Sequence, residues 1–401
     1  MKEWKLYKLS DFIHFNPTLS LKKGTIAKKI TMDQLIPYSR EIYSWVNEPY
    51  SGGAKFQNGD TIMARITPCL ENGKHAYVSI LDNNEIAYGS TEYFVMRGIE
   101  GVSDNLFVYY LTHYPEFKNA AIKSMVGSSG RQRAQLDVLK NLEYELPDLD
   151  EQIQIATLLS SIDDKIALNK RINDNLEQQA QALYRSWFVD FEPFKDGNFI
   201  ESELGLIPED WKVVELGEVT KHITEKVKNR SDVKVLSPVT TGELVLSEEY
   251  FTKQVFSESI AKYITVKPLQ FAYNPARVNI GSLGMNTFEF DGCVSPVYVV
   301  FECERDYQYF FDYFRKTDSF KEEVLARAIG GVRQSLSYKD FSLIKLIYPP
   351  RAIVEKFNRL YSKILENINH NKVESNNLAD MRDTLLPKLM SGELKINDLD
   401  C

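Results

Sequence analysis

The sequence predicts an α+β fold in which two globular mixed α/β domains are separated by two long paired helices, arranged as a pseudo-two-fold internal repeat. Apolar residues recur at alternating steps of four and three from Ile155 to Trp187, which is the heptad pattern of a helix that packs against another helix. The same pattern returns 202 positions later, from Phe357 to Leu389. The ten residues that begin at Glu3 are matched by those that begin at Asp210, so a unit of about 200 residues is duplicated.

Both predicted helices carry the same narrow apolar seam. Each seam is polar at the same two places, Asn169 and Asn173 in the first helix and Asn371 and Ser375 in the second, and we interpret Asn169 and Asn371 as residues that set the register. At 1.5 Å per residue each helix is about 48 Å long, which makes the pair a rigid spacer. The seam residues that we expect at the helix pair are Ile155, Leu159, Ile162, Ile166, Asn169, Leu176, Leu183, Phe357, Tyr361, Ile364, Ile368, Asn371, Leu378 and Leu385.

Helix start and stop signals flank both seams. Asp148 is placed to be the N-cap of the first helix, with Glu151 as its capping-box partner. We expect Pro193 and Gly197 to end this helix, and Pro387 to kink or end the second one.

Between these landmarks, the two middle regions differ almost completely in sequence, which suggests that the ends share a structural task while the middles do different things. Short β-branched and alternating runs predict strands, and longer amphipathic runs predict helices. In the first copy we expect strands at 60–66, 88–96 and 142–146 and helices at 104–114 and 116–125. In the second copy we expect a strand and turn at 273–282, strands at 294–301 and 344–348, and helices at 306–315 and 319–327. The connector 194–209 shows no clear periodicity.

Composition restricts the class of protein. A chain of 401 residues with 43% hydrophobic and 26% charged content is long enough for two or three ordinary globular domains. Its net charge of −8 argues against indiscriminate nucleic-acid binding through a basic surface. The four cysteines lie far apart without C-x-x-C spacing, and no apolar run has the length of a membrane span. We therefore expect a cytoplasmic protein with reduced thiols, no zinc site and no membrane partner.

The candidate binding residues gather in loops beside predicted strands. Two glycine-rich loops, Gly127–Arg133 and Ile329–Gln334, occupy the same address in both copies. Their glycines let backbone approach a partner, and Arg and Gln donate hydrogen bonds suited to phosphates and base edges. The alternative, a surface loop that closes a strand, stays open. With two polar clusters next to strands, the candidate DNA-binding residues are Arg65, Asn72, Lys74, Arg131, Gln132, Arg133, Asn274, Arg277, Asn279, Arg333 and Gln334.

Other features favour a structural interpretation over a functional one. The lysines at 22, 23, 28 and 29 form a basic run that would hold a phosphate backbone or, as the alternative, simply a solvated face. The aromatic segment 307–314 has helical spacing and is expected in the core. There is no P-loop, no glycine-rich dinucleotide motif, no nucleophile elbow and no histidine pair with metal-ligand spacing. We therefore predict no catalytic residues and no metal site in this chain.

Four segments resemble the specificity subunit of type I restriction-modification systems, and the resemblance covers essentially the whole chain. They are Ala64–Lys74, Ala182–Phe188, Gly205–Trp211 and Leu385–Leu394. One departure is that the first half begins almost directly at Trp4, without a Gly-x-Ile-Pro lead. The resemblance implies that the two helices are an antiparallel pair and that each middle region is a target-recognition domain. It implies a first recognition domain at 1–146, a central helix at 147–191, a connector and second recognition domain at 192–348, and a C-terminal helix and tail at 349–401.

The resemblance also implies partners. Each recognition domain is expected to read half of a bipartite site in double-stranded DNA, and the helices to dock two methyltransferase subunits, with restriction and translocase subunits joining through the complex. S-adenosylmethionine, ATP and Mg²⁺ are expected on those partners, and no cofactor on this chain. A spacer of about 48 Å limits the half-site separation to near 14 base pairs, and unequal middles predict an asymmetric site. The alternative is a non-catalytic protein-interaction scaffold with two globular domains, whose complexes need not weaken steeply with salt as DNA binding does.

Overall fold

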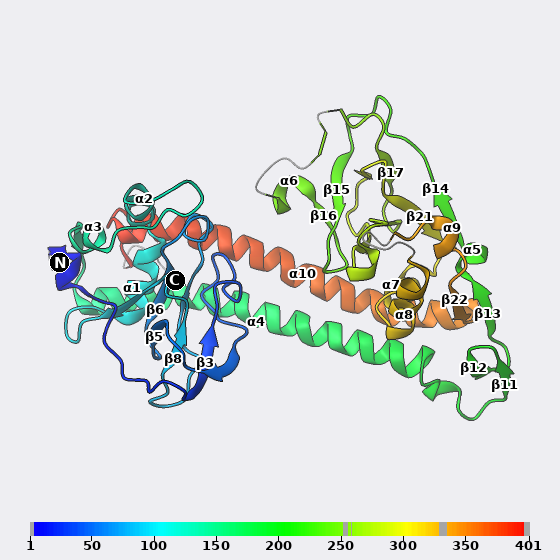
Figure 1. Cartoon of the computed structure of the whole chain (residues 1–401), viewed down its shortest axis with the longest axis horizontal. Helices are drawn as coiled ribbons and strands as arrows, with labels where there is room; N and C mark the ends of the chain where they lie inside the picture. Colours follow the sequence, from blue (N-terminus) through cyan, green and yellow to red (C-terminus); the bar gives the residue numbers. More distant parts are fainter. Residues whose placement is uncertain (1–3, 252–255, 258, 329–334, 397–401) are drawn as a thin grey trace. The chain divides into compact units, whose positions relative to one another are not determined.

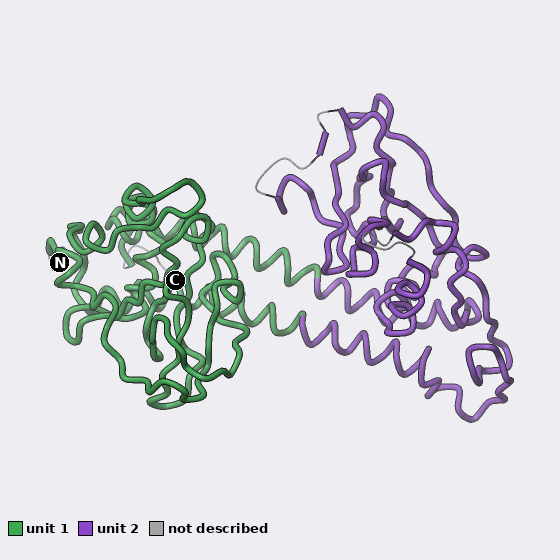
Figure 2. Tube along the Cα trace, in the orientation of Figure 1, with its two compact units in different colours: residues 1–173, 369–401 green, residues 174–368 purple. Residues whose placement is uncertain are grey.

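The computed structural model describes residues 4–251, 256–257, 259–328 and 335–396. It confirms the α+β fold with two long helices and two sheet-containing regions (Figure 1). The chain forms two compact units (Figure 2): unit 1 comprises residues 1–173 and 369–401, and unit 2 comprises residues 174–368. These units divide both long helices, so they differ from the domain boundaries expected from the sequence, which stay a prediction.

The two long helices are α4, Leu149–Phe188, and α10, Arg351–Met390, each of 40 residues. Their contacts show that they run antiparallel. Asp163 pairs with Arg382, Asn173 accepts a hydrogen bond from Asn371, and Tyr184 packs edge-on against Phe357, so positions that ascend along α4 meet positions that descend along α10.

The seam residues expected from the sequence are all buried or half-buried in the structure. The polar members make contacts across the pair. Asn169 Nδ2 donates to Glu374 Oε2 at 2.7 Å and lies 3.3 Å from Ser375 Oγ, and Asn371 Nδ2 donates to Asn173 Oδ1 at 2.8 Å. Polar groups inside an apolar seam are stable only in a register that pairs them.

The ends of α4 and α10 follow the sequence signals in part. Asp148 Oδ1 accepts a hydrogen bond from Glu151 N at 3.1 Å, as expected of an N-cap. Pro193 lies beyond the end of α4. Pro387 lies inside α10, which continues to Met390, so Pro387 does not end the helix; the other alternative, that Pro387 kinks the helix, stays a prediction. The buried side chains of Leu389 and Met390 keep the last turn helical.

Unit 1 contains two four-stranded sheets and one two-stranded sheet. The strand orders are β2-β9-β6-β7, β4-β3-β8-β5 and β1-β10, with β3 and β8 parallel and the other neighbours antiparallel. Their bounds are β1 Lys5–Lys8, β2 Ile13–Phe15, β3 Ile26–Ile30, β4 Val46–Pro49, β5 Ala54–Phe56, β6 Thr61–Ala64, β7 His75–Tyr77, β8 Ala87–Gly89, β9 Tyr93–Gly98 and β10 Glu143–Leu146. The helices are η1 Leu9–Asp11, α1 Asn105–His113, α2 Pro115–Lys123 and α3 Leu136–Lys140.

Unit 2 repeats this arrangement. Its sheets have the orders β14-β21-β18-β19, β16-β15-β20-β17 and β13-β22, again with one parallel pair, β15 and β20, and it adds the hairpin β11-β12. The strands are β11 Phe199–Ser202, β12 Gly205–Pro208, β13 Lys212–Glu215, β14 Thr220–Ile223, β15 Lys234–Pro238, β16 Leu244–Leu246, β17 Ile264–Val266, β18 Phe271–Tyr273, β19 Leu283–Met285, β20 Gly292–Val294, β21 Val299–Cys303 and β22 Lys345–Tyr348. The helices are η2 Glu192–Phe194, α5 Leu216–Val219, α6 Ser247–Tyr250, η3 Val278–Ile280, α7 Gln308–Phe314, α8 Asp318–Arg327 and α9 Tyr338–Phe341.

The two middle regions therefore share one strand order although their sequences diverge. Equivalent turns show why both sequences fit it. Asp60 Oδ2 accepts from Gln57 N in the turn before β6, and Gln270 Oε1 accepts from Lys267 N in the turn before β18, both at 2.8 Å. Different side chains close the same turn, so the divergence leaves the architecture unchanged.

Most of the expected strands lie at the predicted positions, but the strands in the structure are shorter than the predicted ranges. The run predicted at 88–96 is split between β8 and β9, and the run at 294–301 between β20 and β21, because the chain passes from one sheet to the other within each run. Most of the strand and turn expected at 273–282 is a loop with η3. The hairpin β11-β12 lies in the connector, where no periodicity was found.

Each core includes one end of the helix pair. In unit 1, α1 and the sheet pack with Ile155, Leu159, Leu386 and Leu389. In unit 2, the aromatic residues of α7 are buried, which confirms their expected core role, and they pack with Tyr184, Phe188 and Phe357. The three described cysteines, Cys69, Cys293 and Cys303, are free thiols.

A histidine pair in the unit 1 core gives the protein a pH-dependent stability. The rings of His75 and His113 lie 3.7 Å apart, and neither Nε2 has a hydrogen-bond partner in the part of the chain that the structure describes. Burial lowers the pKa of His75 to about 3, and it also lowers the pKa of His113 well below its ordinary value. Both rings are therefore neutral in the folded unit.

We predict that the chain loses stability as the pH falls from about 6.5 toward 3, because the unfolded histidines then bind protons that the folded ones do not. The double variant His75→Gln/His113→Phe should flatten urea unfolding midpoints measured between pH 6.5 and pH 4.5. The exposed His14→Gln is the matched control and should keep the wild-type slope. A wild-type slope in the double variant would contradict the assignment.

Candidate nucleic-acid interface

Three segments of unit 1 meet at the end of β6. They are the loop 65–74 that follows β6, the turn before β9 and the glycine-rich loop 126–134. Arg65 N donates to Glu92 O at 2.9 Å, Ala134 N donates to Arg65 O at 2.8 Å, and Thr67 N donates to Gln132 O at 3.0 Å. Backbone hydrogen bonds thus bring together two of the loops that carry the candidate residues.

A carboxylate lies between two of the candidate arginines. Arg133 Nε is 3.0 and 2.9 Å from the two oxygens of Glu92, and Arg133 Nη2 is 2.7 Å from Glu92 Oε1. Arg65 Nε lies 3.7 Å from the same carboxylate, and its guanidinium lies over the ring of Phe94. The hydrogen bonds from Arg133 lower the pKa of Glu92, so the cluster carries two positive charges and one negative charge.

The remaining candidate DNA-binding residues of unit 1 differ in exposure and in the segments that they contact. Arg131 is exposed in the turn that begins at Ser128, and Gln132 is half-buried. Asn72 is half-buried in the turn after Pro68. Lys74 Nζ donates to Met32 O at 2.7 Å, which ties this side chain to the segment after β3. The structure therefore joins Arg65 to the 131–133 loop and directs Lys74 elsewhere.

Unit 2 places its candidates at the corresponding strand end. The loop 274–282 follows β18, and Leu336 N donates to Pro275 O at 3.1 Å, as Ala134 does to Arg65. Asn274 Oδ1 accepts from Ala276 N at 3.0 Å, and Arg277 is exposed. Asn279 is half-buried in η3. Arg333 and Gln334 lie outside the described residues.

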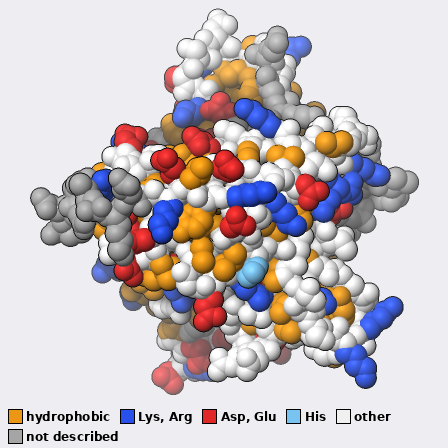
Figure 3. All heavy atoms as spheres, turned by 90° about the vertical axis from the view of Figure 1, so that its left-hand side faces the viewer, with side chains coloured by type: hydrophobic (Ala, Val, Ile, Leu, Met, Phe, Trp, Pro, Cys, Tyr) orange, Lys and Arg blue, Asp and Glu red, His pale blue; other side chains and the backbone are white. Residues whose placement is uncertain are grey.

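Two of the four lysines in the basic run pair with carboxylates. Lys28 Nζ donates to Glu85 Oε2 at 2.7 Å, and Lys29 Nζ donates to Glu48 Oε2 at 2.8 Å, while Lys22 and Lys23 are exposed. Figure 3 shows a face on which Lys and Arg side chains alternate with Asp and Glu side chains, without an extended area of one sign. This surface is suited to selective contacts and unsuited to strong non-specific attraction of nucleic acid.

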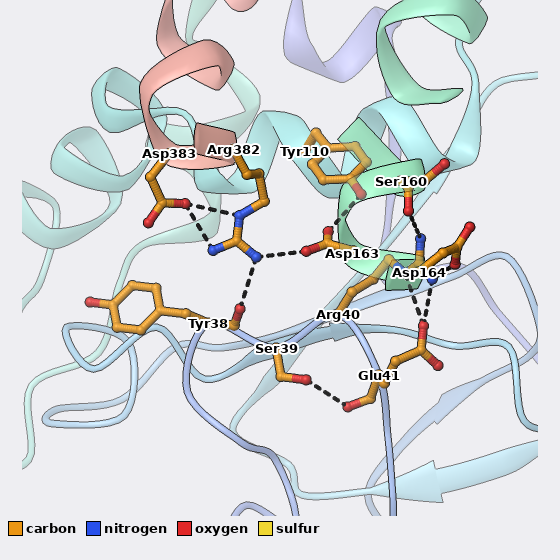
Figure 4. A network of polar contacts seen from close by, with 10 residues as sticks. All are labelled: Tyr38, Ser39, Arg40, Glu41, Tyr110, Ser160, Asp163, Asp164, Arg382 and Asp383. Carbon is orange, nitrogen blue, oxygen red and sulfur yellow. Dashed lines mark hydrogen bonds and ion pairs between the residues drawn. The ribbon is translucent and has the colours of Figure 1, made fainter. Parts of the chain in front are cut away.

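A buried polar network, drawn in Figure 4, links the loop 38–41 of unit 1 to both helices. Arg382 Nη1 pairs with Asp163 Oδ1 at 2.7 Å, and the two side chains are only 7% and 5% exposed. Tyr110 donates to Asp163 Oδ2 at 2.7 Å. Arg382 reaches Tyr38 O at 3.4 Å, and Arg40 lies 3.3 Å from Ser160 O. These contacts hold the loop 38–41 against both helices.

Sequence reasoning missed Glu92 and this network. Glu92 gives no local signal, because its partners lie 27 and 41 positions away along the chain. The pairing of β6 with β9 brings Arg65 close to it, and the bridge between Ile66 and Arg133 brings Arg133 close. Arg382 did give a signal, since it occupies a seam position where a charged residue needs a buried partner. Asp163 is that partner, and the heptad pattern alone does not identify it.

The fold is that of a two-unit protein in which each unit packs on part of an antiparallel helix pair. Residues 1–178 match the family model described as the type I restriction modification DNA specificity domain. The chain is 28% identical to the type I restriction enzyme MjaIX specificity subunit of Methanocaldococcus jannaschii, over 73% of this chain and 70% of that one. It is 23% identical to the HindI specificity subunit of Haemophilus influenzae, over 98% of this chain and all of that one.

A solved structure has the same fold. The S subunit of the type I restriction-modification system of M. genitalium superimposes with a TM-score of 0.53 at 15% identity, over 96% of each chain. Residues 1–178 therefore carry the DNA specificity domain of this family, and the chain is similar along nearly its whole length to specificity subunits of type I restriction-modification systems. No described helix is long and apolar enough to span a membrane.

We predict that Arg382→Ala lowers the free energy of unfolding by about 3–5 kcal/mol, because it leaves the Asp163 carboxylate buried without its cation. Urea unfolding of the purified chain measures this change. The exposed Arg359→Ala on the same helix is the control and should change it by less than about 0.5 kcal/mol.

The double variant Asp163→Leu/Arg382→Ala should be more stable than Arg382→Ala alone, since neither charge remains buried. It installs the residue types found 202 positions away in the repeat, Leu365 and Ala180. A double variant less stable than the single one would contradict this account of the network.

Proposed function

We propose that unit 1 and unit 2 each read one half of a bipartite, asymmetric site in double-stranded DNA through the loops at the ends of β6 and β18. The observation that carries this proposal is that both units place their candidate loops at the same position in the fold. The two units have the same strand order, and different polar loops follow the equivalent strands β6 and β18. In unit 1 these loops carry Arg65, Arg131 and Arg133, and in unit 2 they carry Asn274 and Arg277. Guanidinium and amide groups are the side chains that most often contact phosphates and base edges.

We further propose that two methyltransferase subunits dock on the helix pair, and that restriction and translocase subunits join through them. The described part of α10 offers an apolar strip outside its own seam. Val373 and Met381 are 60% and 46% exposed and flank a shallow hollow of about 310 Å³ that Leu378 also lines. Apolar side chains on a solvent-facing helix surface support a role in binding another helix or domain.

In this proposal the chain recognises DNA and performs no chemistry itself. Among the described residues no group of three or more His, Cys, Asp and Glu side chains is arranged to hold a metal ion. S-adenosylmethionine, ATP and Mg²⁺ would act on the partner subunits, which would also extrude the adenine to be methylated. The role of this chain is to bring those partners to one DNA sequence.

We predict that co-expression with its genomic methyltransferase neighbour produces methylation of a split, asymmetric motif, mapped across the host genome by long-read sequencing. Exchange of residues 1–146 for those of a relative should change one half of the motif and leave the other half intact. A soluble, assembled complex that methylates no new site would favour the alternative function, a scaffold that binds only proteins.

We predict that Arg131→Ala weakens recognition of one half-site and Arg333→Ala weakens recognition of the other, each by roughly 1–3 kcal/mol where the lost contact is to a base. Competition binding with duplexes altered in one half at a time measures both effects. Wild-type affinity and site choice in both variants would show that the loop assignment is wrong.

A further inference from the structure

We propose that Glu92 positions the guanidinium of Arg133 to read a guanine in the half-site recognised by unit 1. This inference rests on the proposed function and names the base class that one of its loops would take. Glu92 acts here as a positioning residue, while Arg133 makes the contact with DNA.

The hydrogen bonds around Arg133 leave one edge of its guanidinium available. Nε and Nη2 donate to the carboxylate of Glu92, and Nη1 donates to the carbonyl oxygen of Arg131 at 3.4 Å. A guanidinium has five N–H groups in a fixed plane. One hydrogen on Nη1 and one on Nη2 therefore remain, and they lie side by side at the end of the fork when the Arg131 carbonyl takes the Nη1 hydrogen on the Cδ side. This parallel pair matches O6 and N7 on the major-groove edge of guanine.

The position of Arg133 is fixed before DNA arrives. Its backbone pairs with Val126 through two hydrogen bonds of 2.9 and 3.0 Å, and its side chain is held by Glu92. The Arg133 side chain is 41% exposed, whereas that of Glu92 is 23% exposed. The donor edge is thus reachable while most of the carboxylate is covered. A side chain that is already ordered loses less conformational entropy on binding.

The same charges argue against a phosphate as the ligand of Arg133. Glu92 cancels the charge of one of the two arginines, and it would repel an anionic phosphate placed beside its carboxylate. A guanine edge is neutral and presents two acceptors, so the pair of Arg133 and Glu92 can bind it without bringing two anions together.

The arrangement exists only in unit 1 among the described residues. The pair Met63–Phe94 in unit 1 is equivalent to the pair Tyr273–Val299 in unit 2. Arg65 comes two residues after Met63, and Glu92 comes two residues before Phe94. Their counterparts in unit 2 are therefore Pro275 and Val297. Val297 is 70% exposed and carries no charge. The guanine contact should therefore belong to one half-site alone.

The test uses the full chain assembled with its methyltransferase subunits, after methylation mapping has defined the wild-type motif. Duplexes are compared in which each guanine of the motif is replaced in turn by 7-deazaguanine, which lacks the N7 acceptor. Wild type should lose about tenfold or more in affinity at one guanine of the unit 1 half-site. Glu92→Gln and Arg133→Ala should both abolish that discrimination, and the double variant should be no worse than Arg133→Ala.

Two controls separate positioning from folding. Glu48→Gln removes another carboxylate of unit 1 that holds a cation, Lys29, and should leave the discrimination unchanged. Recognition of the unit 2 half-site should be wild type in every variant, whereas a folding defect would reduce recognition of both halves.

Several outcomes would overturn the inference. One is a unit 1 half-site without a guanine at which N7 matters. Another is an Arg133→Ala variant that weakens all sequences equally and reduces the salt slope by about one, the mark of a phosphate contact. A third is a Glu92→Gln variant that binds more tightly with unchanged base preference. A wild-type complex without any split motif would instead reject the proposed function, and this inference with it.

Discussion

The antiparallel pairing of α4 and α10 is the constraint on which the rest of the structure depends. A 40-residue helix with a narrow apolar seam is marginal in water by itself and gains its stability from tertiary packing. Both cores use this packing. Ile155 and Leu389 close the core of unit 1, and Tyr184 and Phe357 close that of unit 2. Folding of either recognition unit is thereby coupled to formation of the helix pair within it.

The two units pack against the long helices through different kinds of contact. In unit 1, Asp163 and Arg382 are buried and satisfied by each other, by Tyr110 and by the backbone at Tyr38. The equivalent positions of unit 2, Leu365 and Ala180, are apolar, and the junction there is aromatic. A buried ion pair adds little net stability over an apolar contact, yet it tolerates only one geometry. The repeat is therefore symmetric in strand order and asymmetric in what holds each unit to its helices.

Under the proposed function, one architecture supports two specificities. The strands that carry the loops have the same order and the same turns, so mutation of the loops leaves the core intact. At the end of β6 a carboxylate fixes an arginine fork, whereas at the equivalent point before β21 the chain presents an exposed valine. The overall negative charge disfavours non-specific attraction to DNA, so the proposed DNA binding would depend on these local contacts.

The sequence by itself determined the long helices, their polar register positions and the internal repeat, because helical periodicity and caps are local signals that recur every few residues. It also indicated which loops carry Arg, Asn and Gln side chains. Only the tertiary structure decided that β8 and β9 are separate strands, that Lys74 binds the carbonyl of Met32, and that Glu92 lies between Arg65 and Arg133. Those contacts join residues tens of positions apart. They depend on strand register and sheet exchange, which no local pattern encodes.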